Sequence, residues 1–213
     1  MNGPEIDVST AVSRGGTSAD HSPEGSGRVI VYEFLSLDGR FEGPPGNEMD
    51  WVQRHFSHEI EVDIAAQYER LGGFLMGRRT FDSLASYWPT SAAAHEHLVG
   101  AMNTLPKLVI SHRSDVSAWA NSHHLGDEPF VALRRELAAR GEIMLIGSQD
   151  IADQLARADL VDEYRFLVFP EVLGRGRHLF PAEGPSRSWM TTRSRRYDTG
   201  AVALHLERPP TRS

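Results

Sequence analysis

The stretch Phe74-Leu75-Met76-Gly77-Arg78-Arg79-Thr80 joins a short apolar run, through one glycine, to a polar segment. Three apolar residues stopped by glycine predict a short buried strand, and residues 78–87 predict a helix directly after it. The same order recurs at Ile143-Met144-Leu145-Ile146-Gly147-Ser148, where the last two residues open a further predicted helix. Helices that alternate with short apolar strands are typical of parallel βαβ units, whose ligands bind at the carboxyl ends of the strands.

The rest of the chain extends this pattern and then changes it. Residues 29–35 are almost continuously apolar, as in a strand that is buried on both faces. Near the C-terminus, two strand-like segments flank Asp198-Thr199-Gly200, which predicts an antiparallel hairpin. The expected fold is α/β: a mixed, mostly parallel central sheet flanked by helices, with a C-terminal antiparallel hairpin. The predicted strands are 29–35, 74–76, 107–110, 143–146, 164–169, 189–197 and 201–206, and the predicted helices are 57–71, 78–87, 92–102, one around Phe130 to Leu137 and one after Ser148.

Composition places the chain among ordinary globular proteins and limits its partners. With 213 residues and 40% apolar side chains, it can bury a core of normal size. The 29 acidic residues outnumber the 22 basic ones, and the net charge of −7 argues against nucleic acid or an anionic membrane as a partner. The absence of cysteine excludes thiolate metal sites and a cysteine nucleophile. No apolar run is long enough to span a bilayer and no secretory signal is recognisable, so a cytoplasmic location is expected.

We expect one ordered domain between two tails. Residues 1–27 are rich in glycine and small polar residues and poor in apolar ones, which predicts a disordered arm. The ordered domain is expected over residues 28–208, and residues 209–213 form the second tail.

Three of the predicted strands end in glycine, arginine or hydroxyl residues. A helix N-terminus offers unpaired N–H groups, glycine lets a phosphate approach the backbone, and arginine supplies two parallel donors. These strand ends together predict a site for a phosphorylated ligand, and two glycine junctions suit a pyrophosphate. The alternative is that the glycines only end strands and the arginines are solvated. The three segments are Gly77-Arg78-Arg79-Thr80, Ser111-His112-Arg113 and Gly147-Ser148.

Other common sites lack their motifs. No Gly-x-Gly-x-x-Gly follows a strand, no Walker sequence is present, and no Gly-x-Ser-x-Gly elbow supplies a hydrolase nucleophile. His95 and His97 stand two residues apart in a predicted helix, where their side chains diverge, so we predict no metal site. His55 and His58 could share a helix face, for which a solvated surface is the simpler interpretation.

Four motifs in one order carry a resemblance to a known family. The sequence resembles the reductase domain of bifunctional riboflavin-biosynthesis enzymes and its free-standing relatives in the dihydrofolate-reductase-like superfamily, over residues 28–207. The deaminase half of those enzymes is not expected, because no His-x-Glu with Pro-Cys-x-x-Cys is present. The resemblance implies one domain, NADPH laid across the strand ends and a homodimer. The motifs are Ser36-Leu37-Asp38-Gly39-Arg40, Gly77-Arg78-Arg79-Thr80, Val161-Asp162-Glu163-Tyr164 and Phe169-Pro170-Glu171-Val172-Leu173-Gly174-Arg175-Gly176.

The resemblance also implies roles for individual residues. The first phosphate junction would be Gly77, Arg78 and Thr80, the second Gly147 and Ser148, and the adenosine ribose would meet Ser111, His112 and Arg113. The nicotinamide would lie beside Leu37, Asp38 and Gly39, with Asp38 also at the substrate and Asp50 and Trp51 opposite as the substrate wall. In relatives arginine often follows the serine directly, whereas here His112 intervenes, which leaves the partner of the 2′-phosphate open. Asp50 could relay a proton if Trp51 raised its pKa, or could simply cap a helix.

Three functions remain open from the sequence. The first is an NADPH-dependent reductase acting on the C=N or C=O of a small heterocycle, pyrimidine or pterin-like, for which aligning the cofactor and excluding water are the main demands on the protein. The second is a non-catalytic NADPH-binding dimeric scaffold or sensor. The third is a sugar-phosphate or nucleotide hydrolase, which the missing nucleophile and metal disfavour.

Overall fold

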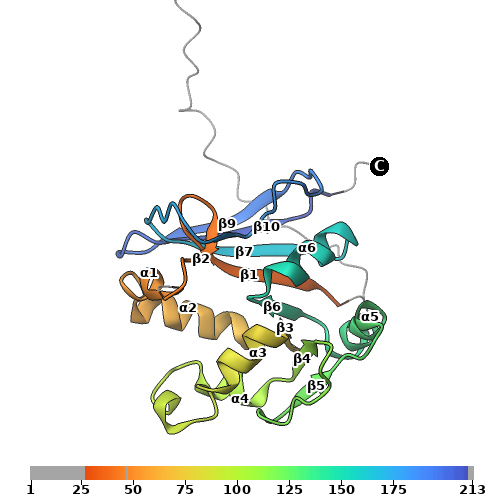
Figure 1. Ribbon diagram of the computed structural model, residues 1–213. Coiled ribbons are helices and arrows are strands. Elements are labelled where there is room, and N and C mark those ends of the chain that lie inside the picture. The colour runs from red at the N-terminus through yellow and green to blue at the C-terminus, as the bar shows by residue number, and fades with distance from the viewer. Residues whose placement is uncertain (1–26, 47, 211–213) are drawn as a thin grey trace, which may run out of the picture.

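A computed structural model describes residues 27–46 and 48–210 (Figure 1). Its main sheet has the strand order β5-β4-β3-β6-β1-β7-β10-β9. The pairs from β5 through β7 are parallel, whereas β7–β10 and β10–β9 are antiparallel. This arrangement confirms the predicted mixed sheet with a C-terminal hairpin. The strands are β1 Val29–Leu35, β3 Gly73–Gly77, β4 Lys107–Ile110, β5 Ser122–His124, β6 Ile143–Ile146, β7 Glu163–Val168, β9 Met190–Arg196 and β10 Val202–Glu207.

Helices cover both faces of the sheet and give it two cores (Figure 1). On one face α2, α3 and α4 pack over a core that includes Trp51, Phe74 and Trp119. On the other face α5 and α6 pack over a core that includes Leu133 and Leu155. Strand β1 is central, and successive side chains of a strand point to opposite faces of the sheet. The apolar side chains of β1 are therefore shared between the two cores. The helices are α1 Asp50–Gln53, α2 His58–Tyr68, α3 Arg78–Ala85, α4 Val99–Thr104, α5 Pro129–Arg140 and α6 Gln149–Arg157.

Most predicted elements lie within a few residues of the observed ones. Ser57 caps α2 as expected, because its side chain accepts a hydrogen bond from the Ile60 amide. Asp63 then anchors α2 to the hairpin. Its carboxylate accepts hydrogen bonds from Arg193 and Arg195 at 2.9 Å and from the Tyr197 hydroxyl at 2.7 Å.

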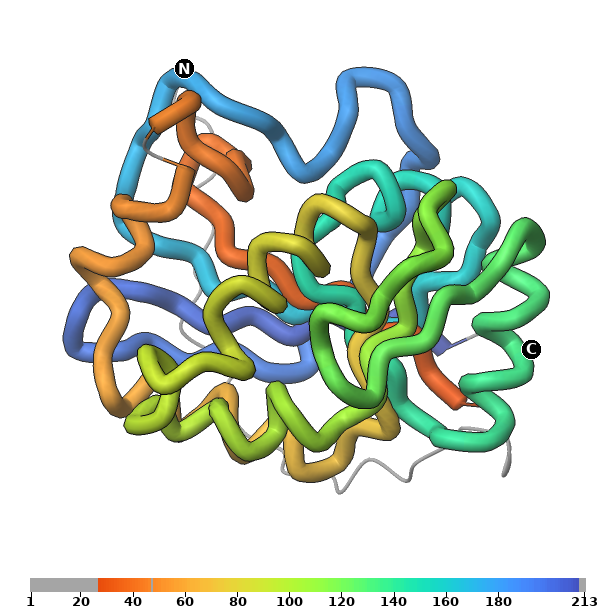
Figure 2. The backbone as a smooth tube through the Cα atoms, turned by 60° about the horizontal axis from the view of Figure 1, so that its bottom comes forward, coloured from red at the N-terminus to blue at the C-terminus, as the bar shows by residue number. Residues whose placement is uncertain are grey.

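Three features differ from the predicted elements. The helix predicted over 92–102 is instead a short 3-10 helix, η1 Ser91–Ala93, followed by α4 from Val99. Strand β5 has the polar sequence Ser-His-His, which carries no apolar signal. A separate two-stranded sheet pairs β2 Arg40–Glu42 with β8 Arg177–His178. In Figure 2 the orange segment that holds β2 runs beside the light-blue segment that holds β8.

Of the predicted arm at residues 1–27, residues 1–26 lie outside the described residues, and so do residues 211–213 of the predicted tail at 209–213. Among the residues that the structure describes, no helix is long and apolar enough to span a membrane.

Candidate functional site

Two helices begin directly at the carboxyl ends of neighbouring parallel strands. Gly77 ends β3 and is the N-cap of α3, and Ser148 follows β6 and is the N-cap of α6. Neither helix has a side-chain hydrogen bond to its first turn, so backbone donors are left for a ligand. Strands β3 and β6 are paired, which places the two N-termini at the same edge of the sheet. The N–H groups and dipoles of two adjacent helix N-termini favour a negatively charged group at this edge.

These two junctions are packed directly on each other. The Gly77 amide donates to Oγ of Ser148 at 2.7 Å, and that oxygen lies 2.8 Å from Oγ1 of Thr80. Gly147 has a φ of +63°, and a Cβ at this position would stand 2.9 Å from Oγ1 of Thr80. A residue with a side chain would therefore be both strained and crowded there.

The third strand end adds Arg113, which joins Arg78 of α3 around one carboxylate. Asp82, in α3, lies 2.8 Å from Nε of Arg78 and 2.9 Å from Nη2 of Arg113. The hydrogen bond from Arg78, aided by the charge of Arg113, lowers the pKa of Asp82 below its usual value. Arg113 is 66% exposed, so its guanidinium can leave Asp82 for another anion at little cost. Asp115 also lies near both arginines, so two carboxylates accompany the two positive charges at this rim.

All three strand ends open into one cavity of about 1320 Å³. A typical small-molecule pocket measures roughly 300–1,000 Å³, so this cavity has room for a large ligand and a second small one. The predicted cofactor residues that it brings together are Gly77, Arg78, Thr80, Ser111, His112, Arg113, Gly147 and Ser148. Because β3 pairs in parallel with both β4 and β6, the carboxyl ends of these three strands lie at the same edge of the sheet.

Apolar side chains, most of them aromatic, form a further wall of this cavity. They come from β1, from α2 and its preceding loop, and from α3 through α4, and they pack against the core on that face of the sheet. Such rings offer flat faces on which a planar heterocycle can stack, with ring centroids about 4.5–7 Å apart. The residues are Tyr32, Phe34, Phe56, Ile64, Tyr68, Leu84, Trp88, Leu98 and Met102.

Glu33 also lines the cavity and is a residue that sequence reasoning missed. It lies in the central strand β1 and is only 6% exposed. Its Oε1 atom has no hydrogen-bond partner among the described residues. Burial raises the pKa of Glu33 to about 8, so the carboxyl group is mostly protonated at neutral pH. The available signal was one acidic residue within an otherwise apolar strand.

Asp38, predicted as a catalytic and substrate-binding residue, does not line the cavity. Its carboxylate accepts hydrogen bonds from the Ser36 hydroxyl, the Arg40 guanidinium and the amides of Leu173 and Gly174, at 2.7–3.0 Å. Burial tends to raise the pKa of Asp38, but these hydrogen bonds outweigh it and hold the pKa well below its usual range. The carboxylate therefore fastens the turn after β1 to the loop at 171–174.

The other residues predicted at the nicotinamide and substrate end do not line the cavity either. Leu37 and Gly39 belong to the turn that Asp38 holds, and neither lines the cavity. Trp51 is fully buried in the core and donates its indole N–H to the Glu48 carbonyl oxygen at 2.8 Å, so it offers no surface to a substrate. Asp50 is exposed at the start of α1 and does not line the cavity. Met49 and Gln53, on either side of them, do line it.

Comparison with known proteins agrees with this arrangement. A family model described as the RibD C-terminal domain matches residues 28–203. The uncharacterized protein YyaP of Bacillus subtilis is 24% identical over 180 residues, which cover 83% of this chain and 93% of YyaP.

Solved structures share the fold. A protein of Shewanella sp. PV-4 assigned to riboflavin biosynthesis matches with a TM-score of 0.69 and 24% identity, over 85% of this chain and 99% of that one. RibD of Acinetobacter baumannii matches with a TM-score of 0.64 and 15% identity, over 86% of this chain and 58% of that one. The yeast riboflavin biosynthesis reductase Rib7 matches with a TM-score of 0.55 and 13% identity, over 87% of this chain and 91% of that one. With most of its length matched by the family model, the chain belongs to the RibD C-terminal domain family, with the dihydrofolate-reductase-like fold.

Proposed function

We propose that this protein is an NADPH-dependent reductase that delivers hydride to a C=N or C=O bond of a small planar heterocycle, pyrimidine or pterin-like. The observation that carries the proposal is the pair of uncapped helix N-termini, α3 and α6, opening into the same cavity as an aromatic wall. An anion site beside an apolar wall suits a dinucleotide and a flat substrate side by side. The named reductases among the structural neighbours support the same reaction class.

The cavity residues fit the cofactor at its charged end. The N-terminal amides of α3 and α6 would bind the pyrophosphate, because they are donors without capping side chains. Arg113 and Arg78 would face the 2′-phosphate, and Ser111 and His112 the ribose beside it. NADPH bound there would supply the hydride.

The aromatic wall would hold the substrate and exclude water from the reacting atoms. Tyr32 and Tyr68 are almost fully buried, while Phe34, Phe56 and Trp88 are partly open to the cavity. A dry apolar wall strengthens every hydrogen bond made within it.

Glu33 would supply the proton. When hydride adds to the carbon of C=N or C=O, the nitrogen or oxygen takes up one proton, and a protonated carboxyl group can give it. Burial raises the pKa of Glu33 to about 8, which keeps it protonated near neutral pH, and Glu33 is among the residues that line the cavity. After the transfer, Glu33 is a carboxylate that regains its proton from solvent.

The test is a titration with NADPH and NADH followed by a panel of heterocycles scored for oxidation of the reduced nicotinamide. We expect saturable NADPH binding and turnover with at least one pyrimidine or pterin-like compound. Absence of NADPH binding at millimolar concentration contradicts the proposal. Binding without turnover on any compound favours the scaffold or sensor, and the absence of Asp38 and Asp50 from the cavity lining is consistent with that function. The homodimer is proposed with the reductase, and light scattering checks it.

A further inference from the structure

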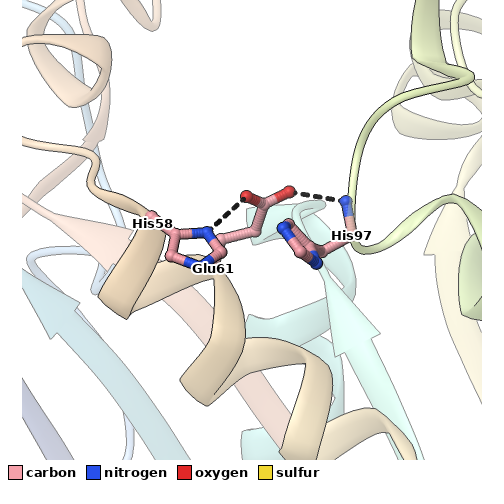
Figure 3. A group of neighbouring side chains, drawn as sticks. All are labelled: His58, Glu61 and His97. Carbon is pink, nitrogen blue, oxygen red and sulfur yellow. Dashed lines mark hydrogen bonds and ion pairs between the residues drawn. The ribbon is translucent and has the colours of Figure 1, made fainter.

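Two histidines and a glutamate meet outside the cavity, in a cluster formed by His58, Glu61 and His97 (Figure 3). His58 is the first residue of α2, and Glu61 lies three residues later on the same face of that helix. His97 comes from the segment between η1 and α4. One possible ligand atom from each residue lies within 4.8 Å of the other two. The three side chains thus join two elements that are distant in sequence.

This donor set is one that a particular class of metal ion prefers. Two imidazole nitrogens and one carboxylate oxygen suit Zn²⁺ and similar transition metals, whereas Mg²⁺ and Ca²⁺ prefer oxygen ligands alone. With metal–ligand bonds of about 2.0–2.2 Å, ligand atoms in a tetrahedral site lie about 3.3 Å apart. The two ligand atoms that lie farthest apart must therefore approach each other by about 1.5 Å. The His58 side chain is 70% exposed and can rotate to do so.

The carboxylate is already held in place. Glu61 is only 14% exposed, and its Oε1 accepts a hydrogen bond from the His97 amide at 2.8 Å. Its Oε2 faces Nδ1 of His58 at 3.9 Å and has no hydrogen bond with that nitrogen. The imidazole rings of His58 and His97 are neighbours, with 4.6 Å between their centroids. Outer hydrogen bonds that fix a ligating carboxylate are typical of metal sites.

We propose that His58, Glu61 and His97 bind one divalent transition-metal ion of the zinc type. The three protein ligands leave a fourth position for water or an exchangeable ligand. The bound ion fastens the segment around His97 to the first turn of α2. The assignment is independent of the reductase proposal, because none of the three residues lines the cavity.

The ion affects the residues that form the cavity wall and does not contact a molecule bound in the cavity. Glu96 and Leu98, which flank His97, both line the cavity, and so does Ile64 one turn beyond Glu61. A metal ion that ties His97 to α2 restricts the motion of this wall. Because the ion binds the folded protein and not the unfolded chain, it also raises the thermal stability of the protein.

The test uses the full chain freed of metal with a chelator. Cobalt(II) is added while its visible absorption is followed, and Zn²⁺ is then used to displace it, with calorimetry to give the stoichiometry. We expect one equivalent of metal, no displacement by Mg²⁺ or Ca²⁺, and a melting temperature that rises with Zn²⁺. His58→Ala and His97→Ala should each weaken binding at least tenfold. Glu61→Gln should do the same, although glutamine still offers an acceptor to the His97 amide.

His95→Ala is the matched control, since His95 is an exposed histidine two residues away in the same segment and outside the cluster. It should bind metal like the wild type. Melting curves without metal identify any variant that is itself destabilised. If His97→Ala or Glu61→Gln is destabilised, His58→Ala still tests the site, because His58 is exposed and its replacement should not affect folding. Equal zinc affinity in the wild type and in a His58→Ala/His97→Ala double variant would place the metal elsewhere and overturn the proposal. So would the absence of saturable cobalt binding, or equally tight binding of Mg²⁺.

Discussion

The hydroxyl oxygen of Ser148 accepts a hydrogen bond of 2.7 Å from the amide of Gly77, so one side chain joins the ends of β3 and β6. Gly77 and Ser148 are 71 residues apart in the sequence, yet their two junctions form one unit in the structure. Their geometry is therefore shared, and a change at one junction is expected to alter the other.

Ser148→Ala should lower both stability and NADPH affinity. The substitution leaves the partly buried Gly77 amide without its acceptor, which costs about 1–3 kcal/mol. Thr80 also loses its hydroxyl partner. Chemical denaturation and an NADPH titration measure the two effects. Ser86→Ala, at the exposed end of α3, should change neither, and an unaltered midpoint for Ser148→Ala would show that the contact is energetically neutral.

Gly147→Ala should destabilise the fold by about 1–3 kcal/mol. The backbone at this position has a φ of +63°, and the added methyl group would stand 2.9 Å from Oγ1 of Thr80. Gly100→Ala in α4 is the control, because a Cβ there meets nothing within 4 Å and a helical alanine should stabilise by about 0.5–1 kcal/mol. Thermal melts compare the pair. Two shifts of the same sign would contradict the structural reason given for Gly147.

Arg113→Ala should weaken NADPH by about tenfold to a hundredfold and leave NADH almost unchanged. A charge-assisted bond to the 2′-phosphate is worth roughly 1.5–3 kcal/mol, and NADH lacks that phosphate. Asp82→Asn should act in the opposite direction, since it releases Arg78 and Arg113 from a competing carboxylate. Titrations at fixed ionic strength are required because exposed charges are screened. Equal weakening of both cofactors would assign Arg113 to the pyrophosphate.

Glu33→Gln should stabilise the protein increasingly as the pH rises from 5 to 8. The wild-type carboxyl group ionises near pH 4.5 when unfolded but near pH 8 when folded, so over this window the unfolded state binds fewer protons. The free energy of unfolding of the wild type therefore falls with pH, by at most about 1.4 kcal/mol per unit, and glutamine removes this loss. Denaturation at several pH values gives the difference. A difference that does not vary with pH would show that Glu33 is ionised in the folded protein.

The same variant tests the proton donor. Turnover should fall while the NADPH affinity stays constant, because glutamine preserves the shape of the side chain but carries no acidic proton. Unchanged turnover would remove Glu33 from the reaction and leave water as the proton source.

Asp38→Asn should lower the melting temperature and leave NADPH binding intact. An asparagine side chain has one acceptor oxygen where the carboxylate has two, so the amides of Leu173 and Gly174 and the guanidinium of Arg40 cannot all be satisfied. Limited proteolysis near residues 171–178 should become faster. A loss of turnover with no change in stability would instead return Asp38 to the catalytic site.

Local patterns predicted the longer strands and the strand–helix junctions at Gly77 and Gly147 well. The strand β6 and its following Gly147-Ser148 form one continuous signal, because a buried parallel strand is apolar throughout and glycine marks its end. The short strands β2, β5 and β8 have no such signal, since they are polar and depend on a partner strand. The predicted helix over 92–102 breaks because the His97 amide donates to Glu61 of α2 and not to its own helix.

The substrate end of the site was harder to predict, because it depends on contacts between distant segments. In the sequence, Asp38 is an acidic residue beside a turn. Only the structure shows that its carboxylate accepts a hydrogen bond from a loop 135 residues later. Tryptophan is a residue type that is common in binding sites, yet Trp51 lies in the core because the short helix α1 packs there. Periodicity cannot distinguish these roles from catalytic ones.

The position of β1 in the sheet has a consequence for how the chain folds during synthesis. Of the strands that the structure describes, β1 is made first, but its neighbours are β6 and β7, so Val29 must await Ile143 before it can pair. Until then an apolar strand is exposed on both edges, and pairings of such long sequence separation form slowly and favour aggregation. The cavity closes only when β6 has joined β1 to β3. Ligand binding at the strand ends is therefore among the last properties that a growing chain acquires, and it can report on the completion of folding.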